Sequence, residues 1–168
     1  MVGKNNLGAI TGLLLLVLLL SAAAHAAQSA ASLTVSVNVD GNCTASTQSL
    51  NFGNPASGDI NSNPTDAEAV LSVNCSTGTP FQIDMDAGLQ PSGCTSARCM
   101  SNGADLLPYN IYLDAARTQV WGTSVGGTQV DGVGVGSPEP HTIYGRIFQA
   151  SNPNPGIYTD TVTITITF

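Results

Sequence analysis

Two stretches of this chain alternate apolar and small polar residues almost without a break, and they constrain the fold more than any other feature. The apolar positions are Leu33, Val35, Val37 and Val39 in the first stretch and Val162, Ile164, Ile166 and Phe168 in the second. Because alternate side chains of an extended strand point to opposite faces, each stretch has one apolar face. The chain is therefore expected to contain β-sheets, with a strand near each end of its folded part.

The first stretch forms a short arm in front of the first cysteine, Cys43. A free arm has an apolar face and a full set of unpaired backbone groups, and both need a groove in which to lie. We expect residues 27–40 to act as a donor strand that fills a groove on another molecule. The alternative is a hairpin at Asp40-Gly41, a favourable turn pair, which would let the arm complete its own domain. The residues between arm and cysteine reach roughly 10 Å, enough for a neighbouring strand but not for the far edge of a sheet.

Residues 1–26 have the pattern of a secretion signal. Lys4 precedes an eight-residue run of leucine and valine at 13–20, and Ala24-His25-Ala26 fits the small-x-small rule for cleavage. The apolar run is too short for a permanent membrane-spanning helix, so a cleaved signal is preferred to a membrane anchor. The sequence predicts an exported protein without stable membrane insertion, in which residues 41–168 form one domain of ordinary size.

The charge of the chain limits its partners. The formal net charge is −7, and loss of the leader leaves three arginines against eleven acidic residues. Nucleic acids and anionic membranes are bound through basic patches, so neither is an expected partner. The chain is otherwise rich in small and β-branched residues and has no helical repeat after the leader, which favours strands and turns.

Strand-like segments separated by Gly, Pro and Asn recur along the domain. Strands are expected at 45–52, 67–75, 81–86, 107–113, 120–121, 129–135, 142–148 and 157–168. The segment 88–103 is expected to be a loop. Short strands at this spacing predict an all-β sandwich of antiparallel sheets.

The four cysteines predict two disulfides, because an even set in an exported chain is normally paired. They are Cys43, Cys75, Cys94 and Cys99, and three pairings are possible. We favour Cys43 with Cys75 and Cys94 with Cys99, since the second pair closes a small loop in a turn-rich segment. A zinc site is disfavoured, because these spacings are not those of zinc ligands and only His141 could join them after the leader.

No group of residues predicts a catalytic site, so we expect that the protein is not an enzyme and needs no metal or cofactor. His141 lies beside a proline-rich turn and is expected to be a surface residue. Asp84 and Asp86 could form a carboxylate pair, but the solvent-facing side of an edge strand is the better interpretation. The glycines between 126 and 136 are not followed by a helical pattern, so they do not predict a phosphate-binding loop.

Residues across the chain after the leader resemble the spore coat U domain. The first half is similar at Cys43-Thr44, Leu50-Asn51-Phe52-Gly53 and Val73-Asn74-Cys75. The second half is similar at Tyr109 to Thr118, Val120-Trp121-Gly122, Tyr144-Gly145-Arg146-Ile147 and Gly156 to Ile164, and its most specific part is Asp114-Ala115-Ala116-Arg117-Thr118. That domain is found in pilins of the archaic chaperone–usher pathway. The resemblance implies an incomplete immunoglobulin-like β-sandwich that lacks its final strand, and it supports the Cys43–Cys75 pairing. Cys94 and Cys99 lie outside the family pattern.

The resemblance also implies a function as a structural pilus subunit. Its partners would be a periplasmic pilus chaperone, an outer-membrane usher and other pilin subunits, and it would reach the cell surface through the periplasm. The acceptor groove and chaperone-binding edge are expected at Tyr158, Val162, Ile164, Ile166 and Phe168. A chaperone strand would fill this groove first, and the arm of the next subunit would then replace it through the donor residues Leu33, Val35, Val37 and Val39.

Attachment or biofilm formation is the role expected of such a pilus. Two other functions stay open on the sequence alone. One is a self-contained secreted spore-coat or envelope protein, and the other is a carbohydrate-binding module.

Overall fold

The computed structural model of the protein describes residues 31–90, 94, 98–149 and 153–168. The chain divides into two compact units between Val37 and Asn38, and the second unit, Asn38–Phe168, is the folded domain. The predicted secretion signal, residues 1–26, lies outside the described residues. In the part of the chain that the structure describes, no helix is long and apolar enough to cross a membrane.

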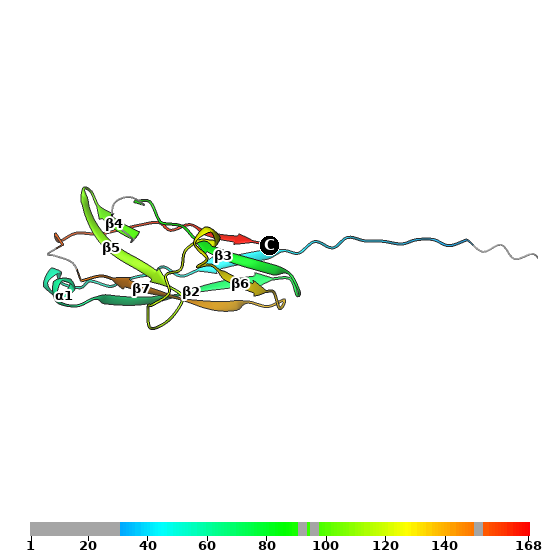
Figure 1. The fold of residues 1–168 in the computed structure, drawn as a ribbon, viewed down its shortest axis with the longest axis horizontal. Coiled ribbons are helices and arrows are strands. Elements are labelled where there is room, and N and C mark those ends of the chain that lie inside the picture. The colour runs from blue at the N-terminus through cyan, green and yellow to red at the C-terminus, as the bar shows by residue number, and fades with distance from the viewer. Residues whose placement is uncertain (1–30, 91–93, 95–97, 150–152) are drawn as a thin grey trace, which may run out of the picture. The chain divides into compact units, whose positions relative to one another are not determined.

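The domain is a sandwich of two antiparallel β-sheets (Figure 1). The first sheet contains, in spatial order, β1 (Cys43–Thr47), β2 (Thr65–Cys75), β7 (Glu139–Ile147), β5 (Asp105–Tyr112) and β4 (Arg98–Asn102). The second contains β6 (Val130–Val133), β3 (Pro80–Met85) and β8 (Ile164–Thr167). A short helix, α1 (Ser57–Ser62), and a 3-10 turn, η1 (Ser124–Gly126), complete the elements. The predicted all-β, immunoglobulin-like sandwich is confirmed.

The core lies between the two sheets and follows the alternation of the strands. On β2 the inward residues are Ala69, Leu71, Val73 and Cys75, and on β3 they are Phe81, Ile83 and Met85. Trp121 is 1% exposed, and its Nε1 donates a hydrogen bond to the carbonyl oxygen of Ile83 at 3.2 Å. Burial of each large aliphatic side chain on β2 and β3 contributes about 1.5–3 kcal/mol to folding on transfer scales.

Several predicted elements differ from the observed ones. The predicted loop 88–103 contains β4, which escaped prediction because Arg98, Cys99 and Met100 are buried in succession and show no alternation. Helix α1 was not expected either, since one buried residue, Ile60, gives no helical repeat. The predicted strands 45–52 and 157–168 are strands only in β1 and β8.

Two interpretations of polar residues are corrected. Asp84 is not on an edge strand, because β3 is the central strand of its sheet, and Asp86 follows the end of that strand. His141 is half-buried on β7 rather than a surface residue, and its ring meets the ring of Phe81 edge-on at 6.2 Å between centroids. Burial lowers the pKa of His141.

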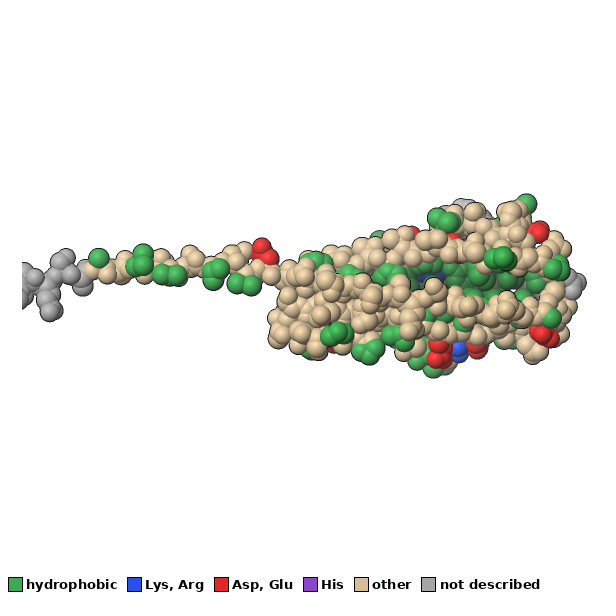
Figure 2. Space-filling view, turned by 180° about the vertical axis from the view of Figure 1, so that it is seen from behind, with side chains coloured by type: hydrophobic (Ala, Val, Ile, Leu, Met, Phe, Trp, Pro, Cys, Tyr) green, Lys and Arg blue, Asp and Glu red, His purple; other side chains and the backbone are tan. Residues whose placement is uncertain are grey.

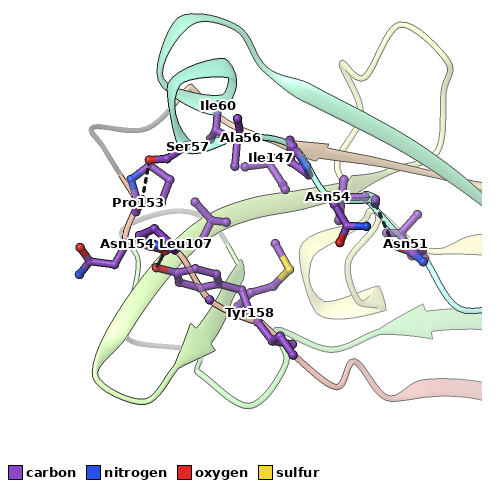
Figure 3. Close-up of a pocket in the computed structure, with 18 of the residues that line it drawn as sticks. Asn51, Asn54, Ala56, Ser57, Ile60, Leu107, Ile147, Pro153, Asn154 and Tyr158 are labelled. Carbon is purple, nitrogen blue, oxygen red and sulfur yellow. Dashed lines mark hydrogen bonds between the residues drawn. The ribbon is translucent and has the colours of Figure 1, made fainter.

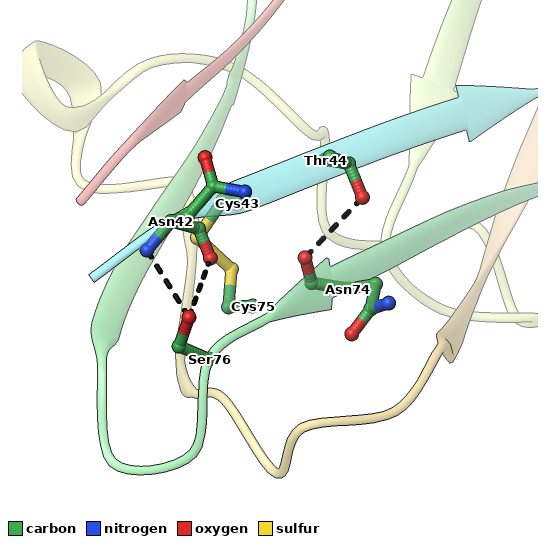
Figure 4. The surroundings of a disulfide bond; sticks show 6 residues. All are labelled: Asn42, Cys43, Thr44, Asn74, Cys75 and Ser76. Atoms are coloured by element: carbon green, nitrogen blue, oxygen red, sulfur yellow. Dashed lines mark hydrogen bonds between the residues drawn. A yellow bond between two sulfur atoms is a disulfide. The ribbon is translucent and has the colours of Figure 1, made fainter. Parts of the chain in front are cut away.

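Both predicted disulfides are present. Cys43 and Cys75 are direct partners in the β1–β2 register, with their Cα atoms 4.1 Å apart (Figure 4). The pairing continues one residue further, because the backbone N–H of Ser76 donates to the carbonyl oxygen of Asn42 at 2.9 Å. The second bridge, Cys94–Cys99, ends on β4.

Replacing Cys43 and Cys75 together by alanine is expected to lower the free energy of unfolding by roughly 3–4 kcal/mol. The two cysteines are 32 residues apart, and their bridge restricts a long loop in the unfolded chain. Urea unfolding followed by the fluorescence of Trp121 measures this loss. The matched double replacement of Cys94 and Cys99, which are five residues apart, should cost only about 2 kcal/mol. Equal losses for the two pairs would contradict the loop-length argument.

Candidate functional site

An open groove runs along the domain between two segments that are mostly outside strands. The first wall is residues 47–57, from the last residue of β1 to the first residue of α1. The second wall is residues 153–164, which end at the first residue of β8. Figure 2 shows hydrophobic side chains gathered in a hollow of the domain surface. In the described part of the chain, β1 and β8 are each at the edge of a sheet, so no strand bridges the two walls.

The groove has two connected parts. The smaller part, of about 360 Å³, lies between residues 47–52 and 158–164. The larger part, of about 760 Å³, lies between residues 49–57 and 153–158, next to α1. Both parts are lined by Leu50, Phe52, Met100 and Tyr158, which shows that they are continuous.

The floor of the groove is the core of the sandwich. Its buried side chains come from four strands and are Met85, Met100, Leu107, Tyr109, Ile111, Ile143 and Ile147. An apolar side chain that entered from outside would therefore pack directly against the core. The groove suits an apolar segment better than a polar ligand, because burial of hydrocarbon is the main interaction that it offers.

The first wall is packed against the floor by its two large apolar residues. The ring of Phe52 meets the ring of Tyr109 edge-on, with 6.2 Å between centroids. Gly145 of β7 makes room for this wall, because a Cβ at that position would lie 2.6 Å from the Leu50 side chain and 2.8 Å from Phe52. The sequence predicted 45–52 as a strand but gave no sign that Leu50 and Phe52 face a groove.

The α1 end of the groove is tied together by hydrogen bonds from side chains (Figure 3). The hydroxyl of Ser57 donates to the carbonyl oxygen of Pro153 at 2.6 Å and so joins the two walls. The hydroxyl of Tyr158 donates to the carbonyl oxygen of Asn154 at 3.0 Å. The larger part of the groove is therefore bounded at this end.

The second wall carries most of the predicted acceptor residues. From Tyr158 into β8, half-buried and exposed residues alternate, and Tyr158, Val162, Ile164 and Ile166 pack against the core. Tyr158, Val162 and Ile164 line the groove, Ile166 lies further along β8, and Phe168 is 57% exposed. The structure thus brings three of the five predicted residues to the groove itself.

The regular pairing of β8 with β3 ends at Ile164, opposite Met85. The N–H of Asp86 donates to the carbonyl oxygen of Thr163 at 3.1 Å, as a continued ladder would require. The carbonyl oxygen of Asp86, however, accepts from Nε of Arg98 at 2.8 Å. The N–H of Thr163 donates to Oδ1 of Asp86 at 2.9 Å, so a side-chain hydrogen bond stands where the ladder would have a second backbone one.

A second carboxylate, Asp160, was missed by the sequence analysis because it interrupts an otherwise apolar row. Its Oδ2 accepts the hydroxyl of Tyr109 at 2.7 Å, and Oδ1 accepts the N–H groups of Leu89 at 2.8 Å and Thr161 at 2.7 Å. Burial, followed by the hydrogen bond and the charge of Asp160, raises the pKa of Tyr109. The phenol therefore keeps its proton and remains a donor.

The residues predicted as the donor strand are exposed. The exposed fractions are 86% for Leu33, 83% for Val35, 83% for Val37 and 82% for Val39. Residues 31–42 are in neither helix nor strand, so the described chain contains no hairpin at Asp40-Gly41. Asn42 is held by Ser76, and a Cβ on Gly41 would meet the side chain of Thr79 at 2.5 Å.

Comparisons with known proteins agree with this architecture. The family model described as Spore Coat Protein U domain matches residues 29–165. Protein U of Myxococcus xanthus is 36% identical over 158 residues, which cover 86% of this chain and 88% of that protein.

The fold is similar to a solved chain in the chaperone–tip adhesion subunit pre-assembly complex from archaic chaperone–usher Csu pili of Acinetobacter baumannii. The TM-score is 0.58 and the sequence identity 23%, over 77% of this chain and 40% of the solved one. This likeness concerns the fold, and the chain spans less than half of the solved chain. The match over residues 29–165 and the identity with Protein U show that the chain belongs to the spore coat protein U domain family.

Proposed function

We propose that this protein is a structural subunit of a chaperone–usher surface pilus and that it polymerises by donor-strand complementation. One observation carries the proposal: the groove is floored by core side chains and bordered by the edge strand β8. Membership of the spore coat protein U domain family and the fold likeness to a complex from archaic chaperone–usher pili support it.

The arm of a second copy is the proposed occupant of the groove. Its backbone would pair with the free edge of β8, and its apolar face would pack on the floor. The inserted side chains would be Leu33, Val35, Val37 and Val39. Burying four such side chains is worth about 6–12 kcal/mol on transfer scales, before the cost of ordering the arm. Exchange of one strand for a better-fitting one would then proceed without a nucleotide.

The proposed route divides the chain into a signal (1–26), a donor arm (27–40) and the pilin domain (41–168). An open groove beside an edge strand is an aggregation hazard, so a periplasmic chaperone would cover it during transit. An outer-membrane usher would then add the subunit to a surface fibre. Attachment or biofilm formation is the proposed role of that fibre.

One observation favours a second candidate, a self-contained envelope protein that fills its groove with its own arm. The wall at 47–52 directly continues β1, so a hairpin at Asp40-Gly41 would lead the arm toward this wall. The chain instead continues the line of β1 past the turn that follows β2, where Asn42 pairs with Ser76 and the backbone of Gly41 passes close to Thr79. Assembly in trans is therefore preferred.

Deleting residues 27–39 from the mature protein is expected to abolish self-association and leave a monomer that binds a synthetic peptide of residues 27–40. The deletion removes the donor strand and leaves the acceptor groove vacant. Light scattering after size-exclusion chromatography measures the first effect, and isothermal titration calorimetry measures the second. A peptide in which the residues at 35 and 37 are aspartate is the control and should not bind.

The same experiment separates the two candidates. Filling in trans predicts that the full mature chain forms polymers that grow with concentration. Filling in cis predicts that the full-length chain stays monomeric at all concentrations and does not bind the peptide, whereas the deletion variant still binds it. Unaltered assembly of the deletion variant would reject both.

A further inference from the structure

The second wall of the groove is held in place mainly by side chains rather than by a strand ladder. Between Tyr158 and Ile164 it makes one isolated bridge, in which Thr159 and Ser101 exchange hydrogen bonds of 2.9 and 3.1 Å. Each irregular residue of the wall loses backbone conformational entropy when it is fixed in one conformation. Other contacts have to offset this loss of entropy if the groove is to keep its shape before a donor strand arrives.

Asp160 supplies three of these contacts from one side chain. The carboxylate joins the wall at Thr161 to the floor at Tyr109 and to the loop after β3 at Leu89, with distances of 2.7 to 2.8 Å. Hydrogen bonds to an ionised carboxylate are roughly twice as strong as neutral ones. A single residue therefore connects three parts of the chain that are far apart in sequence.

The loop opposite Asp160 is shaped to receive its carboxylate. Gly88 has a φ of 77°, which disfavours other residues, and a Cβ there would collide with the Asp160 carboxylate. The same loop is fixed from its other side, because Oδ1 of Asp86 accepts the N–H of Gly88 and the N–H of Thr163, each at 2.9 Å. The wall and the loop after β3 are thus joined by two carboxylates.

The position of Asp160 is unusual for a charged residue. It belongs to the alternating half-buried row of the wall, whose other members are Tyr158, Val162, Ile164 and Ile166. An apolar residue would extend the hydrophobic pattern, whereas a carboxylate there costs free energy unless it is fully hydrogen-bonded. Such departures from the local pattern concentrate at functional sites.

We infer that Asp160 is the positioning residue of the acceptor groove: by tying Thr161 to Tyr109 and Leu89, it holds the second wall apart from the first and keeps the groove open for the arm of a second copy. This inference rests on the proposed function. Without Asp160 the wall is no longer tied to the floor and to the loop after β3, so its loss slows entry of the arm and leaves the sandwich folded.

The test uses the full mature chain carrying V37D, which prevents self-assembly, as the acceptor for a fluorescent peptide of residues 27–40 with the natural sequence. Adding D160A is expected to weaken peptide binding by tenfold or more, mainly through a slower association rate, since the wall must be ordered during binding. Amide hydrogen exchange at Leu89 and Thr161 should increase, while exchange in β2 and β7 stays unchanged. D160N, which keeps the acceptor oxygen for the two N–H groups, should recover most of the affinity.

D131A is the matched control. Asp131 is an exposed residue of β6, accepts hydrogen bonds from two glutamine side chains at 3.1 Å and takes no part in the groove. It should bind the peptide like the parent. If the parent itself does not bind the peptide, the proposed function fails. If the parent and D160A bind with the same rate and affinity, the positioning role of Asp160 is wrong and the proposed function stands. Loss of protection throughout the domain of D160A would also overturn the inference, because the residue would then stabilise the fold as a whole.

Discussion

Replacing Arg98 by methionine is expected to lower the free energy of unfolding by about 3 kcal/mol. Arg98 is 4% exposed, and its guanidinium donates to the carbonyl oxygens of Asp86, Met85 and Trp121 and to Oδ1 of Asn110, at 2.7 to 3.2 Å. Hydrogen bonds to a charged group contribute about 1.5–3 kcal/mol each, and burial of the ion costs several kcal/mol in return. The expected loss of stability is the difference between these two opposing contributions. It stays large because R98M leaves four acceptor oxygens without the donor that they have in the parent.

The matched control is R146M. Arg146 pairs with Asp66 at 2.7 and 2.8 Å, but both side chains are about one-third exposed. An exposed ion pair contributes at most about 1 kcal/mol, so this variant should remain close to the parent in urea unfolding. A loss below 1 kcal/mol for R98M would show that the freed carbonyl oxygens find other donors, and the account of Arg98 given above would be wrong.

The Arg98 site also illustrates why some of the fold cannot be predicted from the sequence. Its partners Met85, Asn110 and Trp121 lie 12 to 23 residues away and on different elements. No local sequence pattern predicts a buried arginine whose hydrogen-bond partners are mainly backbone carbonyl groups. Strands such as β2 and β3 were predictable, by contrast, because one face of each is buried and the alternation is visible in the residues themselves.

The candidate site divides in the same way. The second wall could be predicted, since Val162, Ile164 and Ile166 alternate with threonines. The floor could not, because topology brings its residues together from β3, β4, β5 and β7. The length of the last strand was overestimated for a related reason. Alternation records which side chains face the core, whereas the backbone ladder covers only Ile164–Thr167, and the N–H of Thr163 donates to the Asp86 side chain.

Replacing Val37 by aspartate is expected to abolish fibre formation while the stability of the domain stays within about 0.5 kcal/mol of the parent. In the single chain Val37 is 83% exposed and lies outside any helix or strand, so a polar side chain there should cost the fold little. In the proposed assembly the same side chain packs on the groove floor of a neighbouring copy. An unpaired carboxylate buried there would cost several kcal/mol, which outweighs much of the gain from the remaining arm residues.

S36D is the control that separates burial from charge. Ser36 adjoins Val37 but points to the opposite face of an extended strand, so its side chain would stay in solvent when the arm lies in the groove. Electron microscopy of cells that carry the assembly machinery should therefore show normal fibres for S36D and none for V37D. Urea unfolding of the two purified proteins, compared as monomers at concentrations too low for assembly, should give the same midpoint. Fibres from V37D would contradict insertion of this face, and loss of fibres in both variants would mean that the charge of the arm, rather than burial of Val37, governs assembly.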